Sequence, residues 1–147
     1  MMRGPGLTVA FVVLTWSAGP PFARAQTAEE ANNTVLGAHA GENMRAAGSN
    51  TLIGTNAGRA LATAMRNVFV GDLAGQRNMA DDNVFVGSTT GQRNTTGTRN
   101  TFVGRNGNSN ISGTNNSFFG FQAGELNVDG ANNTLLGVNA GGSNTSG

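Results

Sequence analysis

The few ionisable side chains limit the chemistry that this chain could perform. Its 147 residues contain one histidine, no cysteine and eight acidic residues. A pair of glutamates, Glu42 and Glu125, could hydrolyse a glycosidic bond if the two carboxylates lay close together. Asp81 and Asp82 are adjacent carboxylates, but no base, nucleophile or second cluster accompanies them in the same corner. His39 is the only candidate for a zinc site with the usual nitrogen or sulfur ligands, so we interpret it as a turn residue.

A sequence repeat decides where these side chains can lie. From residue 32 to the C-terminus the chain repeats Asn, then Thr, Ser or Val, then two bulky apolar residues, then Gly. The motif glycine returns at an almost constant interval, so the length of a repeat varies by no more than a single position. The seven copies of the Asn and Gly are Asn33 and Gly37, Asn50 and Gly54, Asn67 and Gly71, Asn83 and Gly87, Asn100 and Gly104, Asn116 and Gly120, and Asn133 and Gly137. Such self-similarity predicts stacked coils that cannot bury their apolar faces alone.

Each coil predicts one short β-strand. With the motif glycine as position 0, the strand covers positions −3 to −1, which gives residues 34–36, 51–53, 68–70, 84–86, 101–103, 117–119 and 134–136. Side chains at −3 and −1 face one way and the side chain at −2 faces the other. Both position −1 and position −2 are apolar in all seven coils. We therefore predict a strand that is buried on both faces, one face in the coil's own core and the other against a second copy of the chain.

The largest side chains at position −2 are the predicted core or interface residues: Phe69, Phe85, Phe102 and Phe118. The repeated Asn and Gly fit turn chemistry. We expect the Asn at −4 to adopt the left-handed conformation and to form a hydrogen-bonded ladder with its copies. A second glycine stands at position +4 in every coil except the fifth, where Gly107 is one place early. At position −5, Arg66, Asp82 and Arg99 should stack with alternating charge and stabilise the register by about 0.2–1 kcal/mol per pair.

The repeat argues against catalysis. Glu42 and Glu125 both occupy position +5 but lie five coils apart, which is about 24 Å at strand spacing. The two carboxylates of a glycosidase lie about 5–9.5 Å apart. We therefore predict a non-enzymatic protein with no cofactor and no metal, and keep a carbohydrate-active β-helix enzyme as a less favoured alternative.

The N-terminal segment, residues 1–25, has the features of a secretory signal peptide. Arg3 supplies the positive start, residues 7–16 form an apolar core, and Ala23-Arg24-Ala25 is a small-residue cleavage box. The apolar core is far shorter than the roughly 20 residues that a membrane-spanning helix needs. We predict cleavage after Ala25, a polar lead-in at residues 26–31, no membrane span in the mature chain, and a secreted or bacterial cell-surface location.

The charge of the mature chain limits its partners. Removing residues 1–25 leaves seven arginines and eight acidic residues, a net charge of 7 − 8 = −1, and the chain has no lysine. The basic patch that binding to nucleic-acid phosphates requires is absent, so we expect no nucleic-acid partner. Without cysteine there is no disulfide, so a small exported domain must be stabilised by packing or by oligomerisation.

The Asn-Thr-apolar-apolar-Gly frame over residues 32–147 resembles the head repeats of YadA-like trimeric autotransporter adhesins, whose strand motif is of the Ser-Val-Ala-Ile-Gly type. It is also similar to repeat arrays of tail-fibre-like surface proteins that end in a self-cleaving chaperone domain. The resemblance implies an all-β fold, a parallel β-solenoid built as a left-handed β-roll of seven 16–17-residue coils, and assembly as a homotrimer. The adhesin motif has a small Ala at −2, where this chain has Phe four times.

These features favour an adhesin or fibre head segment that presents or spaces a surface for a host-surface or matrix ligand. The candidate contact residues are Arg77 and Arg93, which share position +6 in adjacent coils. One alternative is the structural shaft of a tail-fibre-like protein that has lost its C-terminal chaperone domain, because we expect the repeat to be truncated at residue 147. Another is an ice-binding solenoid, because position −3 carries Thr in four coils. We disfavour it because those threonines belong to a face that we expect to be buried.

Overall fold

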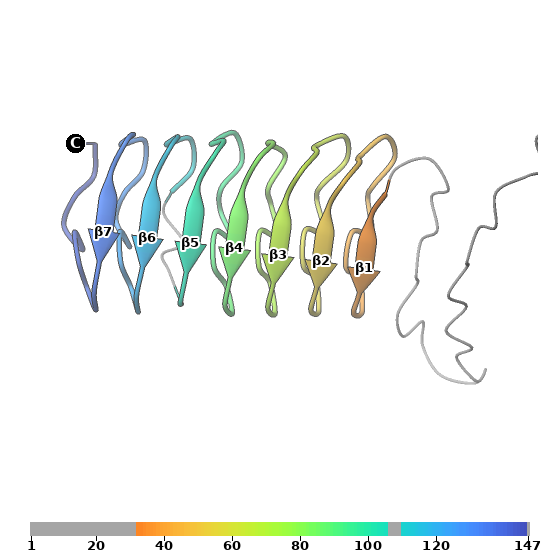
Figure 1. Cartoon of the computed structure of the whole chain (residues 1–147), viewed down its shortest axis with the longest axis horizontal. Coiled ribbons are helices and arrows are strands. Elements are labelled where there is room, and N and C mark those ends of the chain that lie inside the picture. The colour runs from red at the N-terminus through yellow and green to blue at the C-terminus, as the bar shows by residue number, and fades with distance from the viewer. Residues whose placement is uncertain (1–31, 106–109, 147) are drawn as a thin grey trace, which may run out of the picture.

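The computed structural model describes residues 32–105 and 110–146, which form a single seven-stranded parallel sheet. The strands are β1 (Thr34–Leu36), β2 (Thr51–Ile53), β3 (Val68–Val70), β4 (Val84–Val86), β5 (Thr101–Val103), β6 (Ser117–Phe119) and β7 (Thr134–Leu136), in sequence order across the sheet (Figure 1). All seven predicted strands are confirmed with the expected bounds. The predictions for residues 1–25, for residues 26–31 and for Gly107 lie outside the described residues.

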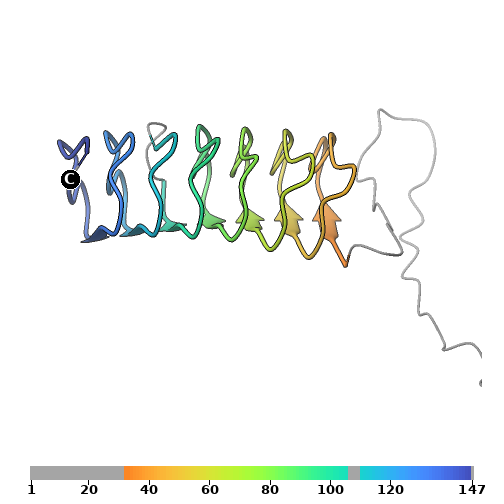
Figure 2. The ribbon, with the colours of Figure 1, turned by 90° about the horizontal axis from the view of Figure 1, so that it is seen from above.

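Equivalent positions of neighbouring coils pair with one another along the whole stack. Phe69 pairs with Phe85 and Phe85 with Phe102, although the first two are one position closer in the sequence than the second two. Backbone hydrogen bonds also join the turns, for example from the amide of Gly58 to the carbonyl of Ala74 at 2.9 Å. The chain is therefore a β-solenoid, with the strands along one side and the turns completing each coil (Figure 2).

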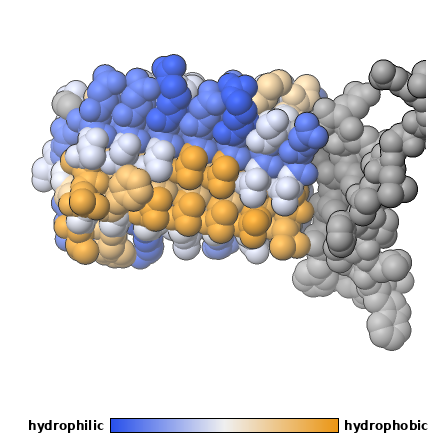
Figure 3. Space-filling view, viewed as in Figure 1, coloured by the Kyte–Doolittle hydropathy of each residue, from blue (hydrophilic) through white to orange (hydrophobic). Residues whose placement is uncertain are grey.

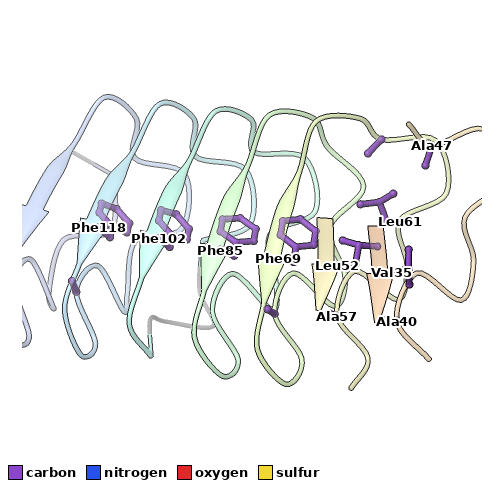
Figure 4. Packing of buried hydrophobic residues seen from close by; sticks show 13 residues of the cluster. Val35, Ala40, Ala47, Leu52, Ala57, Leu61, Phe69, Phe85, Phe102 and Phe118 are labelled. Atoms are coloured by element: carbon purple, nitrogen blue, oxygen red, sulfur yellow. The ribbon is translucent and has the colours of Figure 1, made fainter. Parts of the chain in front are cut away.

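Position −2 forms the core of the solenoid. The rings of Phe69, Phe85, Phe102 and Phe118 are at most 1% exposed and stack in a row with centroid distances of 5.0, 5.0 and 4.7 Å (Figure 4). The predicted alignment is confirmed. The prediction that these residues could form an interface between chains is wrong, because each coil closes around its own position −2.

The core changes composition along the stack. Opposite the strands, position +7 holds Met44 and Leu61 in the first two coils, and the third to sixth coils carry a buried asparagine there or one place earlier. The seventh coil combines Leu135 at −2 with Asn144 at +7. In the first six coils, the smaller aliphatic side chains at −2, Val35 and Leu52, belong to the coils with Met or Leu at +7, whereas Phe belongs to the coils with the buried Asn. A larger residue on one side of the coil thus accompanies a smaller one on the other, as close packing requires.

The corners of each coil use two kinds of residue. The left-handed non-glycine residues lie at positions −5 and +2, for example Arg66 with φ 58° and Leu73 with φ 58°. The predicted left-handed conformation of the Asn at −4 is wrong, because that side chain must point inward and the corner falls on the residue before it. The glycine at +4 also provides space, since a Cβ on Gly75 would lie 2.5 Å from Cε2 of Phe69.

Candidate binding and assembly surfaces

The repeated asparagines at position −4 form a ladder inside the solenoid. In each of the six steps, Oδ1 of one Asn accepts a hydrogen bond from the backbone amide of the Asn in the next coil, at 2.8–3.0 Å. The amide nitrogen is also used, as in Asn83, whose Nδ2 donates to the carbonyl of Gly97 at 2.9 Å. The predicted ladder is confirmed, and its polar groups are occupied by the chain's own backbone.

A second asparagine ladder runs beside the first and was missed by our sequence analysis. Its members, Asn78, Asn94, Asn110 and Asn127, are buried, and each of the last three donates a side-chain hydrogen bond to the one before it, at 2.6, 3.1 and 2.9 Å. The two ladders meet where Nδ2 of Asn83 donates to Oδ1 of Asn78 at 3.2 Å. The nearly constant spacing of these four asparagines was visible in the sequence and could have revealed this ladder.

Removing one rung should destabilise the whole stack. Replacing Asn83 by Ala leaves the buried amide of Asn100 without its acceptor, so we expect the free energy of unfolding to fall by about 2–3 kcal/mol. The exposed Asn43→Ala should change it by less than about 0.5 kcal/mol. Urea unfolding followed by circular dichroism measures both variants, and equal losses would contradict a specific role for the ladder.

Three of the carboxylates that we considered and rejected as catalytic groups, Glu42, Asp81 and Asp82, are members of surface ion pairs. Oε2 of Glu42 accepts from Nε of Arg59 at 2.6 Å, and its Oε1 lies 3.1 Å from Nδ1 of His39. Two bonds from Arg66, at 2.6 and 2.9 Å, hold the carboxylate of Asp82 and confirm the first pair of the predicted stack at position −5. The hydrogen bond from Arg59, followed by that of His39, lowers the pKa of Glu42, and the hydrogen bond from Arg66 lowers the pKa of Asp82.

No arrangement suited to acid–base chemistry emerges from these groups. Glu42 follows β1 and Glu125 follows β6, so the fold does not bring them together. His39 lies in a turn with φ 56°, as predicted, and Asp81 accepts from the backbone amide of Met65 at 2.9 Å. Within residues 32–105 and 110–146, no three His, Cys, Asp or Glu side chains form a group that could hold a metal ion. The same part of the chain contains no helix long and apolar enough to cross a membrane.

The outer side of the sheet is exposed. We call the seven residues at −3 and the seven at −1 the sheet face. At −1, Leu36 is 53% and Leu136 80% exposed, and Val86 is half-buried at the middle of the stack. Figure 3 shows an apolar band along the rod beside a hydrophilic band. No second layer within the described chain covers this side, so the burial of this face by a second copy of the chain stays a prediction.

The exposure of the sheet face in a single chain also bears on the ice-binding alternative. Thr34 and Thr134 are exposed and Thr51 is half-buried, so one chain alone does not bury the threonines at −3. Their rank is interrupted by valines in β3 and β4 and by serine in β6. A regular threonine array is thus present only in part, and this face has mainly apolar character.

The apolar surface widens at one end of the rod. Position +1, beside the sheet face, carries Phe121 and Val138 in the last two coils, and these are 43% and 70% exposed. In the third and fifth coils the same position carries Asp72 and Arg105, which are also exposed. The charged groups thus lie at the margin of the sheet face and not within it.

Arg77 and Arg93 are exposed, as predicted for contact residues. The amide of Arg77 donates to the carbonyl of Gln92 at 3.1 Å, which holds the two coils together at this point. Because the asparagines at +7 point into the core, the arginines at +6 point outward. They lie on the side of the coil that faces the strands across the core, away from the sheet face.

The chain matches no family model, no curated protein and no solved structure. The fold and the surfaces described above define it as a parallel β-solenoid with one uncharged, largely apolar sheet face. Its function must therefore be inferred from that face and from the outward side chains.

Proposed function

We propose that this chain is a non-catalytic rod segment of an exported adhesin-like or fibre protein, and that three copies assemble through the sheet face. The observation that carries the proposal is the continuity of that face. All fourteen of its residues are uncharged, and they extend over the seven strands. Extended apolar surfaces of this kind on small proteins mark sites of association.

The side chains of the sheet face are suited to packing against another copy. Six of its residues are valine or isoleucine and four are threonine. These β-branched side chains are stiff at χ1, so they lose little rotamer freedom when they are covered. A second copy would bury them without placing a charge in the contact.

The homotrimer is proposed from the resemblance to the adhesin head repeats, and the structure removes one objection to it. The Phe residues at −2 differ from the small Ala of the adhesin motif, but they lie inside each coil. The difference therefore alters the core of the coil, while position −1 stays apolar in all seven coils and position −3 carries uncharged Thr, Val or Ser. A shaft of a tail-fibre-like protein would use the same face for the same purpose.

A charge placed in the middle of the sheet face tests this assembly. Val86→Asp should convert a trimer into folded monomers, because three carboxylates would be brought into an apolar contact at the expense of their hydration. The matched control is Thr96→Asp, which adds the same charge to the same coil at an exposed position outside the sheet face. Analytical ultracentrifugation gives the mass, and circular dichroism reports whether each variant is folded.

Two results would refute the proposed assembly. One is a wild-type protein that sediments as a stable monomer at micromolar concentration. The other is a folded Val86→Asp variant that remains a trimer, which would place the contact on another surface. Loss of the trimer in both variants would show a general effect of charge and would also count against the sheet face.

A further inference from the structure

The stacked charges of the solenoid follow a rule with one exception. Where charged residues occupy equivalent positions of neighbouring coils, they have opposite sign: Glu42 with Arg59, and Arg66 with Asp82. Arg77 and Arg93 break the rule, since both are positive and share position +6. Like charges directly opposite one another in neighbouring strands destabilise a sheet.

No carboxylate of the described residues forms an ion pair with either arginine. The side chains beside them, Gln76 and Gln92, are also neutral. They bond to each other, with Nε2 of Gln92 donating to Oε1 of Gln76 at 2.9 Å. On the other side lie the exposed Met79 and the partly exposed Thr95, at position +8 of the same two coils. The repulsion between the two guanidinium groups is therefore not compensated within this part of the chain.

We propose that the Arg77–Arg93 pair binds the anionic groups of an acidic polysaccharide. A guanidinium group donates two parallel hydrogen bonds to a carboxylate or sulfate, and two such groups at the coil spacing of about 4.8 Å can hold one anion between them. The hydroxyl of Thr95 donates to the carbonyl of Ile111 at 3.1 Å but can still accept from a sugar hydroxyl, and Nε2 of Gln76 and Oε1 of Gln92 are not used in the bond between the two glutamines. This inference rests on the proposed surface role and assigns it a class of ligand.

A polysaccharide fits this surface better than a nucleic acid. Nucleic-acid binding needs a broad basic surface, whereas the described residues contain seven arginines and six acidic residues, a net charge of 7 − 6 = +1. The two arginines lie one above the other along the rod, so a linear polymer that follows the rod axis would meet both. They also lie outside the sheet face, so assembly through that face leaves them accessible.

Binding of defined oligosaccharides to the full-length exported protein tests the proposal. The probes are a sulfated heparin octasaccharide, a carboxylated galacturonate octasaccharide and a neutral dextran of similar length, with a single-stranded DNA octanucleotide as the competing polyanion. We expect calorimetry to detect at least one of the two acidic sugars and not the dextran. The Arg77→Gln/Arg93→Gln variant should bind that sugar at least about tenfold more weakly, because several charge-assisted hydrogen bonds are lost.

The matched control is Arg45→Gln/Arg99→Gln, which removes the same charge from two exposed arginines at other positions. It should weaken binding less than about twofold, and without ligand only the Arg77→Gln/Arg93→Gln variant should have a higher Tm than the wild type. Equal loss in both variants, no binding of either acidic sugar, or tighter binding of the DNA would overturn the proposal. The Arg77→Gln/Arg93→Gln variant should keep its oligomeric state, so failure of this inference is distinguishable from failure of the proposed assembly.

Discussion

Replacing Phe102 by Ala is expected to lower the free energy of unfolding by about 3–5 kcal/mol. The ring is 1% exposed and stacks between Phe85 at 5.0 Å and Phe118 at 4.7 Å. Its removal leaves a cavity at the centre of the row and takes a stacking partner from each neighbour, and offset aromatic pairs contribute about 0.5–1.5 kcal/mol beyond their buried area. Since the total stability of a domain is about 5–15 kcal/mol, this one change should remove a large fraction of it.

The matched control for Phe102→Ala is Val103→Ala, one residue further along β5. Val103 belongs to the sheet face and is half-buried, so in a monomer its loss should cost less than about 1.5 kcal/mol. Guanidinium unfolding under conditions that keep the protein monomeric compares the two variants. A larger loss for Val103→Ala would show that the solenoid is held together mainly from its outer side, contrary to the packing described here.

The contrast between position −2 and position −1 also distinguishes an effect on folding from an effect on assembly. Phe85→Asp or Phe102→Asp is expected to unfold the chain, because a carboxylate would be buried without a partner. Asp at Val86 is expected to leave the coil intact and to affect only the association of chains. Circular dichroism distinguishes the two results, since the first loses its β signal and the second keeps it.

The strand bounds could be predicted from the sequence because the period fixes them. Which face of the strand lies inside could not, since Phe85 and Val86 are both apolar and a period of two does not say which side the turns will enclose. That choice depends on the residues that return at or beside position +7. Asn78 and its equivalents were not recognised as core residues because an isolated Asn predicts a turn.

The left-handed corner residues and the ion pairs were also predicted only in part from the sequence. The left-handed residues at position −5 include Ser49, Arg66 and Asp82, so no common residue type indicated that position. We predicted the left-handed conformation at −4 instead, because that position is Asn in every coil. The ion pair of Arg66 and Asp82 was predictable from strand spacing. The pair of Glu42 and Arg59, which both occupy position +5 of adjacent coils, followed from the same repeat but was missed in our sequence analysis.

Gly71→Ala is expected to be among the most damaging single substitutions. Gly71 has φ 137°, which L-residues rarely adopt, and a Cβ there would lie 2.5 Å from the carbonyl oxygen of Gly87 in the next coil. The backbone strain costs about 1–3 kcal/mol, and the collision with a fixed backbone atom adds about 1–3 kcal/mol or more. We therefore expect a total loss of about 2–6 kcal/mol in the free energy of unfolding.

The last coil provides a control in which only the collision is absent. Gly137 occupies the same motif position with φ 121°, but a Cβ there would meet nothing within 4 Å. Gly137→Ala should therefore cost only the strain of about 1–3 kcal/mol. Chemical unfolding gives both values, and hydrogen exchange of β7 in the wild type establishes that the last coil is folded when they are compared. Equal losses in the two variants would mean that backbone conformation, and not the close approach of neighbouring coils, requires glycine at this position.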